Sequence, residues 1–264
     1  MPDYQIQHPL ADAFQHAMTQ PQGEFVVACA VSEFIAEASE SPEALFSEVI
    51  QPFLSLEQKD VQTLLNWFQE QGFTGPQNTV TIAHSDLNFV LEYRQGIPIS
   101  LAVLILETAR RAGFSSFGVN FPGHFLLSIE GSLIDPLSCS IVEDSQLAAL
   151  TAQVKENPQK LLQPASVQMV GLRMLNNVKA QYVAQTNFAK ALEVVDLQLA
   201  CSAGQPELAS SLHFERGEYW QQLGLSAAAR DAYLICAQIC PYPHLANKAQ
   251  ALADQLSGND ETFH

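Results

Sequence analysis

The sequence has few basic residues. Its 12 Lys and Arg residues stand against 28 Asp and Glu residues, which gives a formal net charge of -16. A surface of this charge repels phosphate backbones and anionic lipid, so nucleic acid and membrane partners are not expected. The acidic residues are spread along the chain and do not form a charged tail. The longest apolar run, residues 101–106, is far too short to cross a bilayer.

Signals for secretion, disulfide bonds and cofactors are also lacking. The first five residues contain neither a basic region nor an apolar stretch, so no signal peptide is expected. The cysteines are odd in number and lack tight paired spacing, which favours reduced thiols in a cytoplasmic protein; they are residues 29, 139, 201, 236 and 240. The histidines show no ligand spacing and there is no glycine-rich phosphate loop, so we expect neither a metal nor a cofactor.

Residues 24–75 form a predicted N-terminal helical part, because apolar residues recur there at helical spacing. A second helical signal begins at Pro98 and lasts until Gly113. Residues 101–106 are apolar on every side of this helix. A helix of that kind must be buried on all sides, so we expect it to be the central helix of a core.

A β-hairpin is predicted after this helix. Short strands are expected at 119–121, 124–129 and 132–134, with Glu130-Gly131 as the turn between the last two. A two-residue turn pairs Ile129 with Ser132. His124 then becomes a diagonal neighbour of Asp135 on the same face of the sheet, close enough for a side-chain contact.

A buried helix followed by a hairpin with one His and one Asp is the layout of a Cys-His-Asp hydrolase or acyl transferase. The cysteine of such an enzyme lies at the start of the helix, where the helix dipole favours the thiolate. This helix start offers only Pro98 and Ser100. A serine hydroxyl would need His124 as its general base. The alternative is structural: Ser100 bonds to backbone N–H groups, His124 is an ordinary strand residue, and Asp135 forms the turn before Pro136.

Cys139 follows Asp135 by four residues and could be imagined as a displaced nucleophile. We interpret it instead as a small buried residue, and Cys29, on the apolar face of a helix, in the same way. Cys236 and Cys240 lie on one helix face with no His or acidic partner beside them, which favours core packing over a metal site.

The C-terminal part contains a repeated helical pattern. A polar helix and two prolines within 139–168 mark the predicted domain boundary. Beyond about residue 170, Tyr182 and Ala191 are matched 38 residues later by Trp220 and Ala229. Small residues, an aromatic residue and a final proline have the spacing of a tetratricopeptide repeat at positions 217, 220, 224, 229 and 241. The first repeat is degenerate, because Lys179 takes the place of a small residue.

Four strings together resemble the SirB-type bacterial proteins. They are Gly-Ile-Pro-Ile-Ser-Leu-Ala (96–102), Pro-Gly-His-Phe-Leu (122–126), Leu-Ile-Asp-Pro (133–136) and Arg-Met-Leu-Asn-Asn-Val-Lys (173–179). The resemblance runs from about residue 25 to about residue 245. It implies an α+β fold: a papain-like and transglutaminase-like core with a small antiparallel sheet, followed by an all-α region of tetratricopeptide repeats. We therefore expect a transglutaminase-like domain over 1–150 and a repeat domain over 165–256.

The transglutaminase-like superfamily also implies a Cys-His-Asp triad. His124 and Asp135 match the His and Asp of that triad, and the nucleophile position falls at Pro98 or Ser100. The missing cysteine is typical of the SirB-type branch.

Three functions are compatible with these patterns. The first is a non-enzymatic cytoplasmic protein whose helical repeats bind a protein or peptide partner. Two repeats are fewer than usually stand alone, so we expect them to dock on the core. The second is a hydrolase or acyl transferase that acts on peptide-like amides or esters through a triad of Ser100, His124 and Asp135. The third is a ligand sensor in which the His-Asp pair forms part of a binding site.

Overall fold

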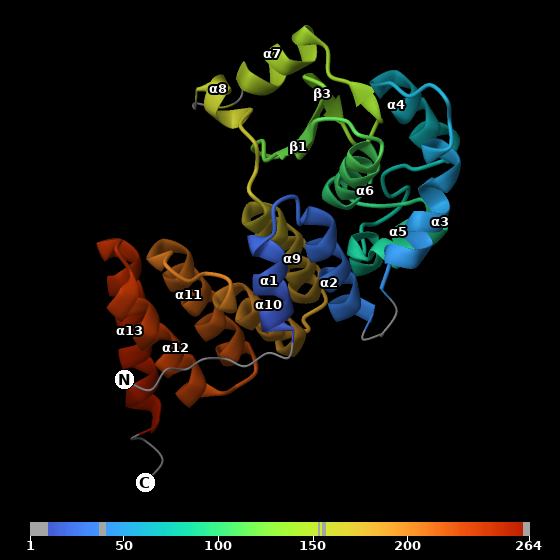
Figure 1. Cartoon of the computed structure of the whole chain (residues 1–264). Coiled ribbons are helices and arrows are strands. Elements are labelled where there is room, and N and C mark those ends of the chain that lie inside the picture. Colours follow the sequence, from blue (N-terminus) through green and yellow to red (C-terminus); the bar gives the residue numbers. More distant parts are fainter. Residues whose placement is uncertain (1–9, 37–40, 153, 155–156, 261–264) are drawn as a thin grey trace. The chain divides into compact units, whose positions relative to one another are not determined.

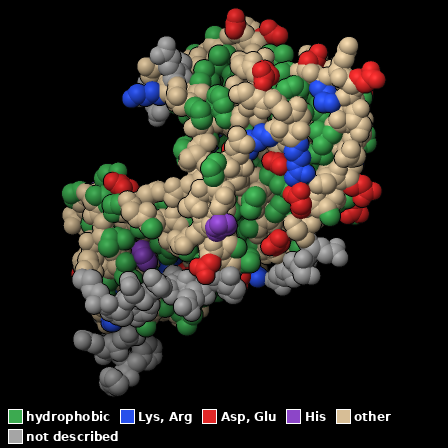
Figure 2. All heavy atoms as spheres, viewed as in Figure 1, with side chains coloured by type: hydrophobic (Ala, Val, Ile, Leu, Met, Phe, Trp, Pro, Cys, Tyr) green, Lys and Arg blue, Asp and Glu red, His purple; other side chains and the backbone are tan. Residues whose placement is uncertain are grey.

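The structure is a computed structural model that describes residues 10–36, 41–152, 154 and 157–260 (Figure 1). Contacts divide the chain into two compact units: His16–Met174, and Met1–Gln15 together with Leu175–His264. The division falls inside helix α9, Val167–Ala184. The sequence-based domain limits, 1–150 and 165–256, stay a prediction. Acidic side chains are scattered over the visible face and do not gather in one patch (Figure 2).

The described chain is mostly helical and has one small antiparallel sheet, which is compatible with the predicted α+β class. None of its described helices is both long enough and apolar enough to span a membrane.

The unit His16–Met174 begins with a series of short helices, as the apolar spacing of residues 24–75 predicts. A side chain fixes where one of these helices begins: the Asp60 carboxylate caps the helix Val61–Glu70 by accepting the Thr63 N–H at 2.7 Å. The helices are α1 (Ala11–Thr19), which crosses from the other unit, α2 (Glu24–Ala36), α3 (Glu43–Leu54), α4 (Val61–Glu70), the 3-10 helix η1 (Ile82–Ser85) and α5 (Leu87–Tyr93).

Helix α6, Pro98–Arg111, is the central helix of this unit. Pro98 is its first residue, and every residue from 99 to 106 is buried. The helix packs against α2 and against strands of the sheet. The prediction of a helix buried on all sides is confirmed. Each fully buried Leu, Ile or Val contributes about 1.5–3 kcal/mol to the free energy of unfolding, so the hydrophobic effect holds the start of α6 firmly in the core.

Four antiparallel strands follow α6 in sequential order: β1 (Ser116–Val119), β2 (Leu126–Ile129), β3 (Ser132–Asp135) and β4 (Ser140–Ile141). The turn between β2 and β3 is Glu130-Gly131, and both residues have positive φ angles, 49° and 80°. This backbone twist matches a two-residue hairpin turn. Ile129 pairs with Ser132, so the predicted register is confirmed.

The strand limits differ from the prediction in four places, and the smallest difference is that β3 ends one residue later, at Asp135. The first strand ends at Val119 instead of starting there, and β2 begins at Leu126, so His124 precedes the strand. The physical reason is a turn at Pro122-Gly123, which the His124 N–H closes by donating to the Phe121 carbonyl at 3.0 Å. Strand β4 was not predicted, because two residues carry no readable alternation. The unit continues with two more helices, α7 (Asp144–Ala152) and α8 (Pro158–Leu161).

The other unit is built from helices that pack on their neighbours in the sequence. In one helical pair, a Cβ atom on Gly217 would lie only 2.5 Å from the ring of Tyr233, so the missing side chain makes room for a buried aromatic ring. Ala191 and Ala229, which the 38-residue repeat relates, are both fully buried. The helices are the end of α9, α10 (Phe188–Ala200), α11 (Pro206–Gln222), α12 (Ser226–Ile239) and α13 (Pro243–Asp260).

Lys179 shows how the two predicted repeats differ. It is buried, although it occupies the position that Gly217 has 38 residues later. Its ammonium group donates to the Gln198 side chain at 2.8 Å and forms an ion pair with Glu215. Gln198 in turn donates to Asn176. A buried charge is tolerated when it is paired and hydrogen-bonded in this way.

Candidate functional site

Ser100 lies in the first turn of α6, where a nucleophile would be expected. Its side chain is fully buried, and its Oγ atom has no hydrogen-bond partner among the described residues. Neither of the two predicted partners, a backbone N–H group or the His124 ring, is therefore bonded to this hydroxyl. A serine that no base contacts keeps its proton and is a poor nucleophile.

His124 is exposed and lies in the loop between β1 and β2. The centroid of its ring is 6.4 Å from that of Phe121. Within the described parts of the chain, no hydrogen bond or ion pair joins this ring to Ser100 or to Asp135. The confirmed register places His124 and Asp135 two positions apart across the hairpin. Their side chains nevertheless contact different groups: the His124 ring lies near Phe121, and the Asp135 carboxylate bonds to residues of the next turn.

Asp135 ends β3 and uses its carboxylate to shape the next turn. One oxygen accepts the Leu137 N–H and the other accepts the Ser138 hydroxyl, each at 3.0 Å. The Ser138 and Ser140 hydroxyl oxygens are 2.7 Å apart, which extends this small network into β4. These contacts agree with the structural alternative, in which the aspartate is a turn former. The catalytic roles of Ser100, His124 and Asp135 stay predictions.

Arg173 is a residue of this region that sequence reasoning did not single out. Its guanidinium donates to the Asn120 side chain and to the Phe121 carbonyl, and it lies 5.6 Å over the ring of Phe125. Burial lowers the pKa of Arg173 below its usual value. Arg173 therefore fixes both sides of the loop that carries His124. Arg173 belongs to the Arg-Met-Leu-Asn-Asn string that carries part of the family resemblance. Nothing in that string shows that its arginine would bind a loop about fifty residues earlier.

The two thiols considered in the sequence as nucleophiles, Cys139 and Cys29, are both buried. Cys139 is buried and its Sγ atom donates to the Pro136 carbonyl, while burial and, less strongly, the charge of Asp135 raise its pKa to about 12. Burial, the largest cause, likewise raises the pKa of Cys29 to about 12. Thiols with these pKa values stay protonated at neutral pH and are not activated nucleophiles. The described residues also contain no cluster of three His, Cys, Asp or Glu side chains that could hold a metal ion.

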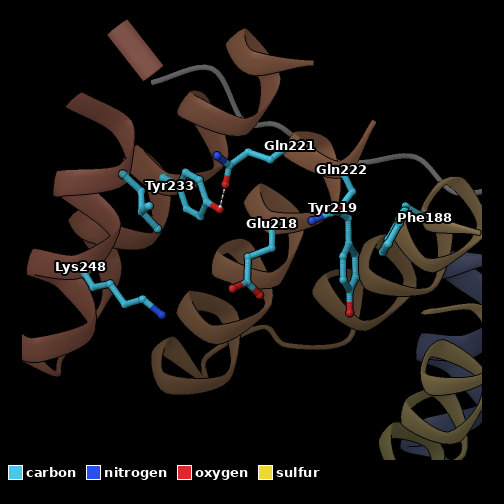
Figure 3. A pocket seen from close by; sticks show the side chains of 8 residues that line it. Phe188, Glu218, Tyr219, Gln221, Gln222, Tyr233 and Lys248 are labelled. Carbon is cyan, nitrogen blue, oxygen red and sulfur yellow. Dashed lines mark hydrogen bonds between the residues drawn. The ribbon is translucent and has the colours of Figure 1, made fainter. Parts of the chain in front are cut away.

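A cavity of about 390 Å³ lies in the helical unit formed by α10 to α13. Figure 3 shows its side chains extending from several helices towards one open space. Aromatic rings, one carboxylate and one ammonium group line it: the residues are Phe188, Glu218, Tyr219, Gln221, Gln222, Tyr233, Lys248 and Leu252. Sequence reasoning did not predict this cavity, because the lining residues belong to different helices and share no motif.

The fold around α6 and the hairpin is that of a transglutaminase-like domain. The family model of the transglutaminase-like superfamily matches residues 29–176, and the chain belongs to this superfamily. A "UPF0162 protein" of Xylella fastidiosa (strain 9a5c) is 28% identical over 224 residues, which cover 76% of this chain and 78% of that protein. A "UPF0162 protein" of Vibrio cholerae (strain El Tor Inaba N16961) is 28% identical over 210 residues, covering 75% and 76% of the two chains. No solved structure matches the chain.

Proposed function

We propose that this chain is a non-enzymatic protein of the SirB type, in which a transglutaminase-like core without a reactive nucleophile is joined to tetratricopeptide repeats that bind a protein or peptide partner. The buried and unpartnered Ser100 hydroxyl carries the proposal. An acyl transferase needs a nucleophile that is both reachable by substrate and activated by a base. Ser100 has neither property, because it is closed inside the core and contacts no imidazole.

Two features of the helical unit support the second half of the proposal. Consecutive helices pack as antiparallel neighbours through small residues, as Gly217 does against Tyr233. Tyr182 and Ala191 are matched 38 residues later by Trp220 and Ala229, as in a repeat. Stacked helix pairs of this kind build extended binding surfaces for peptides. With the acidic net charge and the reduced cysteines, this favours a cytoplasmic protein without nucleic acid or membrane partners.

A fluorophosphonate probe tests the absence of catalysis. The full chain is incubated with this serine-directed reagent, beside a Ser100→Ala variant as the matched control. We expect equal, background labelling of both proteins. Labelling of Ser100 that disappears in Ser100→Ala and in His124→Ala would overturn the proposal in favour of a hydrolase with a triad of Ser100, His124 and Asp135.

Affinity purification from the native cell tests the interaction role. The full chain, a Ser100→Ala variant and a Tyr219→Ala variant, altered in the cavity of the helical unit, serve as baits. We expect the same protein to be enriched by the wild type and by Ser100→Ala, and to be reduced with Tyr219→Ala. A partner retained equally by all three baits, or no enriched protein, contradicts binding through the helical unit.

A further inference from the structure

The geometry of the cavity between α10 and α13 points to a specific occupant. We propose that this cavity binds an extended peptide segment through a Lys or Arg side chain, with Glu218 as the counter-ion of that side chain. The inference deepens the proposed function and rests on it, since it names the chemistry of the partner that the helical unit would bind.

Glu218 provides the first argument, which is one of charge. Its carboxylate extends into the cavity towards Lys248; burial raises the pKa of Glu218, and the charge of Lys248 offsets part of this rise, but the two groups form no ion pair within 4.0 Å (Figure 3). Two other carboxylates of this unit are held by basic residues of the same unit: Glu215 by Lys179, and Asp196 by Arg216. The Glu218 carboxylate is therefore available to a cation supplied by a ligand.

The end of helix α11 and two aromatic rings that line the cavity provide a second argument for a cationic ligand. Glu218 to Gln222 form the last turn of α11, where the helix dipole is negative and which contains no basic residue. The rings of Phe188 and Tyr219 also line the cavity, with their centroids 6.0 Å apart. The faces of aromatic rings attract cations as well as apolar chains. A Lys or Arg side chain has both parts, an apolar stem and a charged head.

The remaining polar groups suit a peptide backbone. Lys248 places its ammonium group 4.5 Å from the centroid of the Phe214 ring and still has donors to spare for peptide carbonyl groups. The Gln222 side-chain amide can donate and accept, and it has no partner among the residues that the structure describes. Gln221 is not free in this way, because it accepts the Tyr233 hydroxyl. One carboxylate for a basic side chain and two groups for the main chain suit a peptide better than a free cation.

A random peptide library displayed on phage, selected against the immobilised full chain, tests the inference. We expect the enriched peptides to share a Lys or Arg residue. The affinity of a synthetic winning peptide is then measured by fluorescence anisotropy. Glu218→Gln should weaken its binding about fivefold, as expected for a partly exposed ion pair. Glu207→Gln is the matched control, because Glu207 lies in the first turn of the same helix and outside the cavity.

A double substitution separates this ion pair from other effects. Replacing the basic residue of the peptide by methionine should cost about the same fivefold with the wild type and nothing further with Glu218→Gln. Peptides that bind without a basic residue, or that lose equal affinity with Glu218→Gln and Glu207→Gln, overturn this inference but leave the interaction role intact. A library from which the chain enriches no peptide overturns both.

Discussion

Gly217→Ala is expected to destabilise the helical unit, although alanine is the better helix former. The new Cβ atom would lie 2.5, 2.6 and 2.8 Å from three ring atoms of Tyr233. Carbon atoms in contact are normally about 3.5–4.0 Å apart, so the ring would have to move by about 1 Å. Tyr233 is fully buried and its hydroxyl is bonded to Gln221, so the ring cannot move without losing contacts.

Two magnitudes decide the sign of this substitution. Overpacking a closely packed core costs about 1–3 kcal/mol, and three overlaps below 3 Å place this site at the upper end. Replacing glycine by alanine inside a helix returns about 1 kcal/mol. We therefore expect the free energy of unfolding to fall by about 2 kcal/mol.

Urea denaturation measures this change. The chain has two tryptophans, so a Trp67→Phe background leaves Trp220, which packs against the core around Tyr233, as the reporter of this unit. Tyr233→Leu is the control, because it removes the ring with which the new methyl group would overlap. When Tyr233→Leu is also present, Gly217→Ala should leave the free energy of unfolding unchanged or raise it by up to about 1 kcal/mol. An equal cost in both backgrounds, or no cost in the first, would refute the steric argument.

Three further predictions concern a buried ion pair, a histidine and the thiols. Arg110 donates to both carboxylate oxygens of Glu24, at 2.6 and 2.9 Å. Glu24→Gln should therefore lower the free energy of unfolding by about 3 kcal/mol, because Arg110 would remain buried without its counter-ion. Urea denaturation checks this, and a loss below about 1 kcal/mol speaks against it. Burial lowers the pKa of His213 to about 4, whereas the unfolded chain binds that proton near pH 6.5. Stability should therefore fall as the pH drops from about 7 to about 4, and His213→Gln should lose less stability over this range in denaturation curves. A maleimide should label the half-buried Cys240 well before Cys139, whose buried thiol has a pKa of about 12; equal rates in the folded protein, followed by mass spectrometry, would disprove this.

Several elements of the fold follow from local physics and can be predicted from the sequence. The apolar run 101–106 has to be buried on every side, whichever segments surround it. Glu130-Gly131 is a two-residue turn because glycine adopts a positive φ without strain, and that turn alone fixes the register of β2 and β3. The 38-residue repeat likewise predicts that Ala191 and Ala229 occupy equivalent buried positions.

The state of the candidate site depends on contacts that no local pattern records. His124 lies outside β2 because of the turn at Pro122-Gly123, and its loop is held by Arg173 from 53 residues away. Asp135 satisfies its carboxylate in the next turn, so sharing a face with His124 does not make the two a pair.

The sequence by itself determined the buried helix and the hairpin, because periodicity and turn chemistry act between residues close in the chain, and four of its strings indicated the superfamily by resemblance. Only the tertiary structure decided that the Ser100 hydroxyl is closed off and that four helices surround a cavity with the Glu218 carboxylate on its wall. Exposure and the neighbours of a side chain are set by packing between distant segments, and one sequence does not state which distant segments meet.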